Sequence, residues 1–156
     1  MHLGLAVYRN AVSAPDSLAV FGERSQTYKD LDTRSNQIAN FLKSLNWERG
    51  QRVAVLLPNR PEILELMTGI SKSSLVYVGL NFRLSHSEML QIFDNCEPSV
   101  IVTDSEYLPL VEEIANSLKI EVFNIDEPEW EMVIRKSSTL LPKSFFDIKS
   151  DDDFCI

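Results

Sequence analysis

Five polar residues stand where buried strands are expected to end: Asn59, Arg60, Asn81, Arg83 and Asp104. In an open parallel sheet, ligands bind in the crevice beyond the carboxyl ends of the strands, so these side chains are the candidates for ligand binding. Each also has a structural interpretation, which we prefer. Asn59 and Asp104 suit helix caps, Asn81 suits a turn, and the two arginines suit surface positions or ion pairs with neighbouring acids. We therefore assign no catalytic, cofactor-binding or metal-binding residue.

An aspartate directly after a strand, as at Asp104, also resembles the phosphate-accepting aspartate of a receiver domain. A receiver needs further acids around its metal and a lysine late in the sheet. The earlier strand end offers Pro58 and Asn59 instead of acids. We therefore discount this interpretation.

Other common catalytic patterns are missing from the sequence. No two of the five glycines lie within nine residues of each other, so no glycine-rich loop can wrap a phosphate. No Gly-x-Ser-x-Gly pattern exists, and there is no basis for naming a nucleophile. His2 and His86 have no partners at metal-ligand spacing and suit surface positions. Cys96 and Cys155 match no metal or redox spacing, which favours free thiols in a reducing compartment.

The stretch Gly50–Leu90 predicts a strand, a helix and a second, parallel strand. Arg52–Leu57 and Leu75–Leu80 are short apolar runs typical of buried strands. Between them, Asn59 is expected to cap a helix, with Glu62 three residues further on. The crossover that joins the two strands is expected to be right-handed.

The N-terminal part predicts a helix over Leu3–Asn10 and then a hairpin. Its strands are Leu18–Gly22 and Ser25–Tyr28, with a turn at Glu23-Arg24. Thr27 and Asp30 form a capping pair that opens the next helix, and Asn46 suits its left-handed end.

The C-terminal part continues the alternation of strands and helices. Ser85 and Glu88 form a second capping pair. The remaining elements are expected as two strands and two helices, at Ser99–Thr103, Ile120–Ile125, Leu108–Leu118 and Trp130–Lys136. Residues 137–150 are expected to form an irregular connection. The whole pattern predicts an α/β fold, with a mostly parallel sheet, helices on both faces and a short N-terminal hairpin.

Composition favours one domain over residues 1–156. A chain of 156 residues with 44% hydrophobic content can bury about 70% of the surface that its unfolded form exposes. Residues 1–93 carry 10 basic and 8 acidic side chains, and residues 94–156 carry 5 and 15. This balance argues against a nucleic-acid surface. No run is apolar enough for a signal peptide or a transmembrane segment, so we expect a cytoplasmic protein.

Several motifs in order resemble the N-terminal region of the adenylate-forming superfamily, and in particular acyl-CoA synthetases such as the long-chain-fatty-acid–CoA ligases. Gln26–Leu31 is similar to the core motif TYxxL, and Leu80–Ser85 is similar to the end of LKAGxxxxPLNxRL. Between them the resemblance includes Arg34–Asn36, Gly50–Val55, Leu57–Asn59, Glu62 and Lys72. It extends over about residues 15–103 and returns at Asp151–Ile156. Departures include Ser73-Ser74, where the family often has Ala-Gly, and these affect turns and packing more than chemistry.

The resemblance implies a reaction of the full-length enzyme. A carboxylate reacts with ATP and magnesium to give an acyl-adenylate, whose acyl group then passes to the thiol of coenzyme A. In the family, a strand like Asp153–Ile156 leads into the phosphate-holding loop TSGTTGxPKG, which this sequence does not contain. No residue here matches a family catalytic residue, and the chain itself is expected to need no cofactor. The isolated chain is therefore expected to be inactive, because no hydrogen-bond donors would stabilise the charge that develops on the phosphate oxygens in the transition state.

Two interpretations of the chain remain open. In the first, it is the N-terminal subdomain of an acyl-CoA synthetase, and its partner is the C-terminal remainder of the same enzyme. In the alternative, it is a free-standing, non-catalytic α/β module that works by binding a partner. In either case exposed apolar surface would allow homo-oligomers. The acyl substrate, its chain length and the acceptor thiol have no signal in these residues.

Overall fold

A four-stranded parallel sheet forms the centre of the computed structural model, which describes residues 3–22, 24–149 and 152–156. The strands are β3 (Arg52–Leu56), β4 (Val76–Gly79), β5 (Val100–Thr103) and β6 (Glu121–Asn124), in the order β4-β3-β5-β6. Every neighbouring pair is parallel. The predicted fold class is confirmed.

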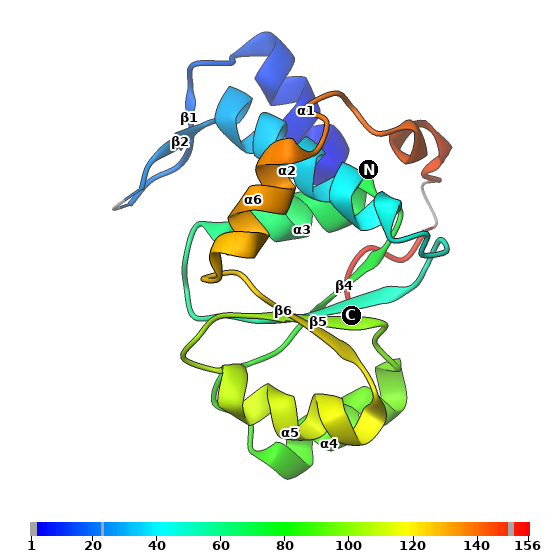
Figure 1. Ribbon diagram of the computed structural model, residues 1–156. Helices are drawn as coiled ribbons and strands as arrows, with labels where there is room; N and C mark the ends of the chain where they lie inside the picture. The colour runs from blue at the N-terminus through cyan, green and yellow to red at the C-terminus, as the bar shows by residue number, and fades with distance from the viewer. Residues whose placement is uncertain (1–2, 23, 150–151) are drawn as a thin grey trace.

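Helices cover both faces of this sheet (Figure 1). One face carries α2 (Tyr28–Ser44), α3 (Glu62–Lys72) and α6 (Pro128–Lys136), and the other carries α4 (His86–Cys96) and α5 (Leu108–Leu118). The two central strands, β3 and β5, are buried on both sides, which is why they read as apolar runs without alternation.

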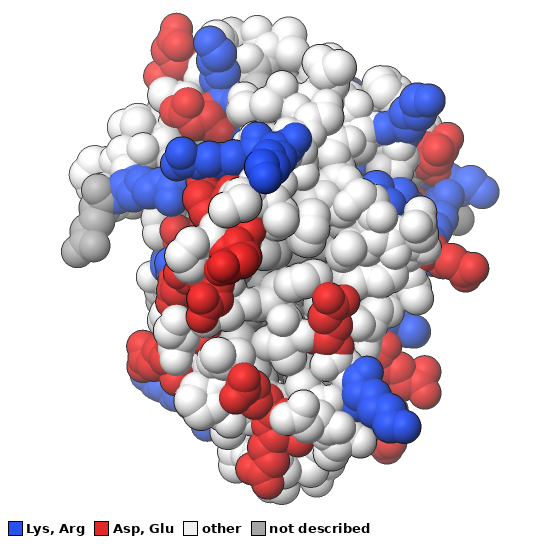
Figure 2. Space-filling view, in the orientation of Figure 1, with Lys and Arg blue, Asp and Glu red and all other residues white. Residues whose placement is uncertain are grey.

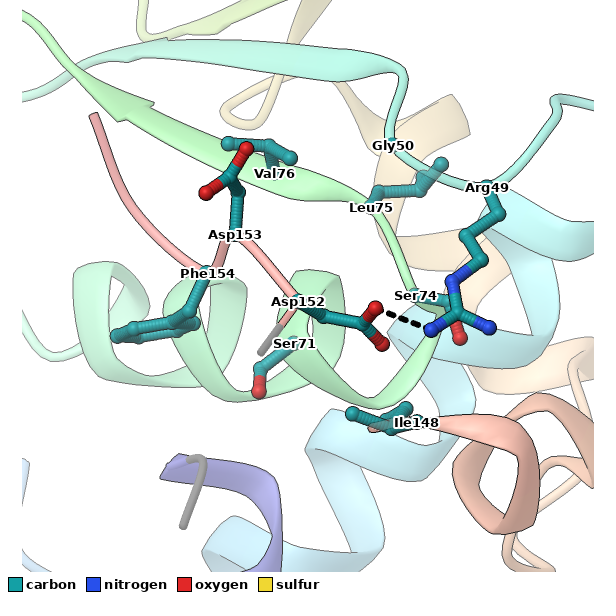
Figure 3. A pocket seen from close by; sticks show the side chains of 10 residues that line it. All are labelled: Arg49, Gly50, Ser71, Ser74, Leu75, Val76, Ile148, Asp152, Asp153 and Phe154. Carbon is teal, nitrogen blue, oxygen red and sulfur yellow. Dashed lines mark hydrogen bonds and ion pairs between the residues drawn. The ribbon is translucent and has the colours of Figure 1, made fainter. Parts of the chain in front are cut away.

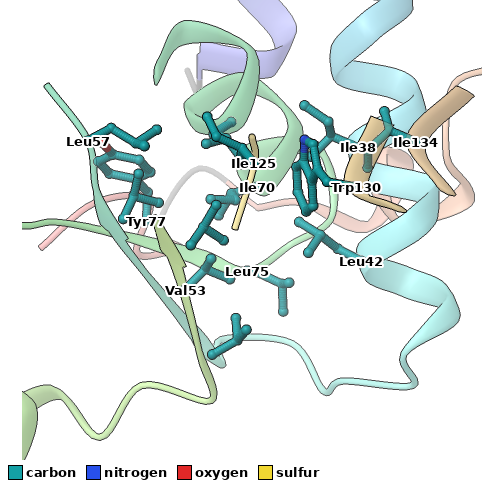
Figure 4. Close-up of a cluster of buried hydrophobic side chains, with 14 residues drawn as sticks. Ile38, Leu42, Val53, Leu57, Ile70, Leu75, Tyr77, Ile125, Trp130 and Ile134 are labelled. Carbon is teal, nitrogen blue, oxygen red and sulfur yellow. The ribbon is translucent and has the colours of Figure 1, made fainter. Parts of the chain in front are cut away.

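Each face of the sheet has its own hydrophobic core. Trp130 lies within the core beneath α2, α3 and α6 (Figure 4). Its ring meets the ring of Phe41 edge-on at a centroid distance of 5.7 Å. The buried side chains of this core are Ile38, Leu42, Val53, Val55, Leu57, Leu66, Ile70, Leu75, Tyr77, Val100, Val102, Ile125, Trp130 and Ile134. The core beneath α4 and α5 contains Ala54, Leu56, Val78, Leu80, Met89, Phe93, Cys96, Ile101, Val111, Ile114 and Ala115.

The N-terminal segment forms a smaller unit beside α2. Helix α1 (Leu3–Ser13) precedes an antiparallel hairpin of β1 (Leu18–Val20) and β2 (Gln26–Thr27). A third cluster of buried side chains joins them, made of Val7, Val20 and Leu31. The hairpin is confirmed, while Glu23 of its expected turn lies outside the described residues.

Both predicted capping boxes are present. The Thr27 side chain accepts the Asp30 N–H while Asp30 accepts the Thr27 N–H, and Ser85 and Glu88 make the same exchange. These bonds satisfy N–H groups that a helix leaves without internal partners. After α2, Asn46 adopts the expected left-handed conformation, with φ at 59°.

The expected cap at Asn59 is wrong. Helix α3 begins at Glu62, its N-cap position is Pro61, and no side chain caps it. Pro61 already has helical dihedrals, with φ at −55° and ψ at −32°, so the proline ring orients the first turn. Asn59 is exposed in the preceding loop.

The C-terminal segment returns across the α2 side of the molecule. A 3-10 helix, η1 (Lys143–Asp147), lies within it. The Asn40 side chain donates to the carbonyl oxygens of Ser138 and Leu140 at 2.9 and 2.8 Å. At its end, Cys155 pairs in parallel with Tyr77 of β4 and so extends the sheet at that edge.

Candidate functional site

The strand order places a topological switch point between β3 and β5. The chain leaves β3 toward α3 on one face, and it leaves β5 toward α5 on the other face. Loops that part in this way open a crevice at the carboxyl ends of the two strands. Arg60 follows β3 and Asp104 follows β5, so both residues lie at the strand ends where the sequence analysis expected them.

Arg60 is surrounded there by carboxylates. Its Nη1 lies 3.3 Å from Asp104 Oδ2 and 3.0 Å from Asp126 Oδ1, and its Nε lies 3.0 Å from Glu62 Oε2. Partial burial opposes the charge on Arg60, but the hydrogen bonds to Glu62 and Asp126 outweigh it and raise the pKa of the guanidinium. Burial would raise the pKa of Asp126, yet the bonds from Ser105 and Arg60 hold it below its ordinary value.

These contacts form an ion-pair network at the strand ends. Glu62 also pairs with Arg24 at 3.3 Å, so two guanidinium groups face three carboxylates, and the cluster is net negative and would repel a phosphate. Asp104 also accepts the Tyr107 N–H at 3.2 Å, just before α5 begins. The network joins the ends of β3, β5 and β6, and its chemistry is structural. The expected ion pairing of Arg60 is thus confirmed. The expected helix cap at Asp104 is wrong, because the N-cap position of α5 is Tyr107 and no side chain caps that helix.

The structure does not bring Asn81 and Arg83 into this network. Asn81 Oδ1 accepts the Arg83 N–H at 2.9 Å, which is the turn expected for that asparagine. The Arg83 guanidinium is exposed and lies over the Phe82 ring, 5.6 Å from its centroid. Because β4 lies on the far side of β3 from β5, its following loop ends away from Asp104.

The histidine and cysteine side chains form no site in the described part of the chain. His86 lies 3.9 Å from Glu113 and is partly exposed, while His2 lies outside the described residues. Cys96 is buried, which raises the pKa of its thiol, and Cys155 is exposed. Within residues 3–22, 24–149 and 152–156, no three His, Cys, Asp or Glu side chains are arranged to hold a metal ion. Every helix among those residues is too short or too polar to cross a membrane.

A buried lysine lies at the end of α3, and its burial, which the sequence analysis did not predict, costs free energy unless the charge is paired. The Lys72 side chain is 0% exposed, and its Nζ donates to Asp32 Oδ1 at 2.6 Å, Asn36 Oδ1 at 2.8 Å and Ser35 Oγ at 2.9 Å. Burial lowers the pKa of Lys72, and the hydrogen bond and charge of Asp32 offset only part of that effect. Asn36 also donates to the Thr139 carbonyl oxygen at 3.0 Å, so the network ties α2, α3 and the C-terminal segment together.

A second buried charge lies two turns earlier in α3. Glu65 is 1% exposed and accepts from Arg24 Nη2 at 3.0 Å, from Arg34 Nε at 3.2 Å and from Gln26 Nε2. Arg34 also pairs with Glu131 of α6. The two networks share one face of α3, and they fix the hairpin, α2 and α6 on it. A polar stripe at helical spacing, Glu65, Thr68 and Lys72, was the signal in the sequence.

A polar pocket of about 320 Å³ lies where the last residues meet β4 (Figure 3). The Asp152 carboxylate pairs with Arg49 across its mouth, while Phe154 O accepts the Tyr77 N–H at 3.0 Å and the Ile156 N–H reaches Tyr77 O at 3.0 Å. These bonds align the segment as a further parallel strand. The pocket is lined by Arg49, Gly50, Ser71, Ser74, Leu75, Val76, Ile148, Asp152, Asp153 and Phe154.

Known proteins share this fold and parts of this sequence. Long-chain fatty acid transport protein 6 of Mus musculus is 37% identical over 93 residues, which are 59% of this chain and 15% of that protein. A medium/long-chain-fatty-acid–CoA/3-oxocholest-4-en-26-oate–CoA ligase of Mycobacterium marinum is 30% identical over 107 residues, 68% of this chain and 19% of that protein. The solved N-terminal domain of FACL13 from Mycobacterium tuberculosis superimposes with a TM-score of 0.89 at 22% identity, covering 100% of this chain and 41% of that one.

The chain thus spans less than a fifth of the length of these two sequence relatives. The family of AMP-binding enzymes matches residues 7–152, nearly the whole chain. By that match this chain belongs to the AMP-binding enzyme family, as part of its N-terminal domain.

Proposed function

We propose that this chain is the N-terminal part of an ATP-dependent acid–CoA ligase of the fatty-acid type. The observation that carries the proposal is the family match over residues 7–152, together with relatives named as CoA ligases. In the proposed reaction, a substrate carboxylate oxygen attacks the α-phosphorus of ATP and pyrophosphate leaves. The coenzyme A thiol then attacks the acyl carbon, and AMP leaves.

We assign no step of this chemistry to the described residues. Arg60 at the switch point is already engaged by three carboxylates, and the described residues include no metal-binding cluster. Transfer at phosphorus needs donors and Mg²⁺ around the α-phosphate. The role we propose for this chain is to form the parallel sheet on which the remaining part of the enzyme builds its site.

ATP–pyrophosphate exchange tests the proposal. The purified 156-residue chain with ATP, Mg²⁺ and a panel of fatty acids is expected to give only the background rate. A chimera in which residues 7–152 replace the matching part of the Mycobacterium marinum ligase is expected to fold and to exchange pyrophosphate. Exchange by the chain alone, or a folded chimera that binds ATP without exchange, would contradict the proposal.

We further propose a cytoplasmic protein whose residues 1–156 fold as one domain, with residues 137–150 as its connecting segment. The two free thiols, Cys96 and Cys155, support a reducing compartment. The closest partner would be the remainder of the same enzyme, and a second copy would bind through exposed apolar side chains. Cell fractionation, one cooperative unfolding transition and sedimentation of the chain test these three points.

A further inference from the structure

The edge strand β6 combines unpaired backbone groups with an aromatic groove. Among the described residues, no strand pairs with the outer edge of β6. The Ile125 N–H donates to the Thr103 carbonyl of β5 at 2.8 Å. Because alternate residues of a strand face the same neighbour, Val122 and Asn124 direct their backbone groups outward. The outer edge therefore offers the N–H and C=O of Val122 and the N–H of Asn124.

A groove of about 390 Å³ runs beside this edge, on the side of α2 and α6. Its floor is aromatic: the Phe123 ring lies 5.5 Å from the Phe41 ring and 5.9 Å from the Trp130 ring, measured between centroids. Val133 of α6 closes one side and is 37% exposed. An apolar side chain of an added strand would rest on this floor, which gives the edge both hydrogen bonds and a side-chain pocket.

The rim of the groove is acidic. Glu121, Glu127 and Glu129 line it and are exposed, and among the described residues no lysine or arginine lines it. Figure 2 shows acidic side chains gathered on the face where α6, β6 and α5 lie in Figure 1. A second copy of the chain would bring the same glutamates to the same edge, so like charges oppose self-pairing. The complementary partner carries lysine or arginine.

We infer that the β6 edge is a docking site for an extended, basic segment of another protein, which adds as a strand. Apolar side chains on one face of that segment enter the groove, and basic side chains at its two ends reach the glutamates on the rim. The site lies at the opposite edge of the sheet from the C-terminal residues, which pair with β4. Docking there is independent of the ligase chemistry proposed above.

Binding of a labelled peptide to the 156-residue chain tests this inference. The probe is a fluorescein-labelled peptide of about nine residues that alternates valine and serine and carries lysine at both ends, and its binding is followed by fluorescence anisotropy. Two variants carry the same change in charge: Val133→Lys places a cation in the groove, and Met132→Lys places it on the neighbouring, 51% exposed position outside the groove. Circular dichroism confirms that both fold.

The docking site predicts that Val133→Lys weakens peptide binding about tenfold, while Met132→Lys changes it less than about twofold. A peptide with glutamate in place of lysine is expected not to bind, and one with serine in place of valine is expected to bind about tenfold more weakly. Hydrogen exchange should slow at the Val122 and Asn124 amides when the probe binds. Equal effects of the two variants, protection only at other amides, or no binding of the alternating peptide would overturn the inference.

Discussion

Replacing Lys72 by methionine tests the buried network more severely than any other single change. Methionine keeps the apolar length of the side chain but removes the ammonium group that three side chains of α2 contact. The Asp32 carboxylate, whose side chain is 16% exposed, would then lack its cation, and Ser35 and Asn36 would lose a donor. Breaking one side of a buried ion pair costs about 3–5 kcal/mol. That is a large part of the 5–15 kcal/mol by which a domain is typically stable.

Urea unfolding followed by tryptophan fluorescence measures this loss. Lys72→Met is expected to lower the free energy of unfolding by about 3–5 kcal/mol. Lys29→Met, at an exposed position of the same helix bundle, is expected to change it by less than about 0.5 kcal/mol. In the double variant with Asp32→Asn, part of the loss should return, because no carboxylate is left without its cation. A Lys72→Met chain within about 1 kcal/mol of the parent would refute the reasoning.

Because the pKa of Lys72 is lowered in the folded chain, the free energy of unfolding depends on pH, and the direction of that dependence follows. Between its lowered value in the folded chain and its ordinary value of 10.5, the unfolded chain binds more protons at this residue. Unfolding then takes up protons, so the contribution of Lys72 to stability rises as pH rises through that window. Comparing the pH dependence of parent and Lys72→Met chains isolates this contribution, and a fall in place of the rise would contradict the assignment.

Three further changes test other parts of the structure by the same unfolding measurement. Arg60→Met should destabilise the fold by about 2 kcal/mol, because it leaves Asp104 and Asp126 without this cation and Glu62 with Arg24 alone. Arg83→Met should cost less than about 0.5 kcal/mol, and equal costs would argue against a structural Arg60. Gly69→Ala would place its Cβ 2.7 Å from a side-chain carbon of α2 and should cost about 1–3 kcal/mol, whereas Gly22→Ala meets nothing within 4 Å and should be neutral; a neutral Gly69→Ala contradicts the close helix packing. Burial, and after it the charge of nearby Cys155, raises the pKa of Tyr77 to about 12. Between about pH 10 and 12 the unfolded chain loses the tyrosine proton first, so the free energy of unfolding should fall by up to about 3 kcal/mol. Tyr77→Phe should remove that fall, and an unchanged pH profile would count against the assignment.

Local signals account for what the sequence predicted well. The capping boxes at Thr27 and Ser85 act over three residues, and both appear as expected. Helix α5 has the predicted bounds, Leu108–Leu118, because its apolar spacing is read within the helix itself. Helix α3 was misplaced at its start, since Pro61 orients the first turn without any side-chain cap.

Contacts between distant residues account for what was missed. Lys72 meets its partners 36–40 residues away in the sequence, and no local pattern pairs them. The strand order was equally hidden. Arg60 and Asp104 meet because β3 and β5 are neighbours, while Arg83 is excluded because β4 is not next to β5. The location of the candidate site at the strand ends followed from the fold class. The ion pairs of Arg60 with Glu62 and Asp126 could be found only in the packed structure.

The mass of the native polypeptide tests the central claim most directly, because the claim is that this chain works as part of a larger ligase. Antibodies against the 156-residue chain would recover the polypeptide from its native source, and mass spectrometry would give its intact mass. If the chain is part of a ligase, the recovered species is far heavier than 17.8 kDa, contains this sequence and catalyses ATP–pyrophosphate exchange. A native species of 17.8 kDa would contradict it, and would identify the chain as a free-standing module whose partners, rather than substrates, are to be sought.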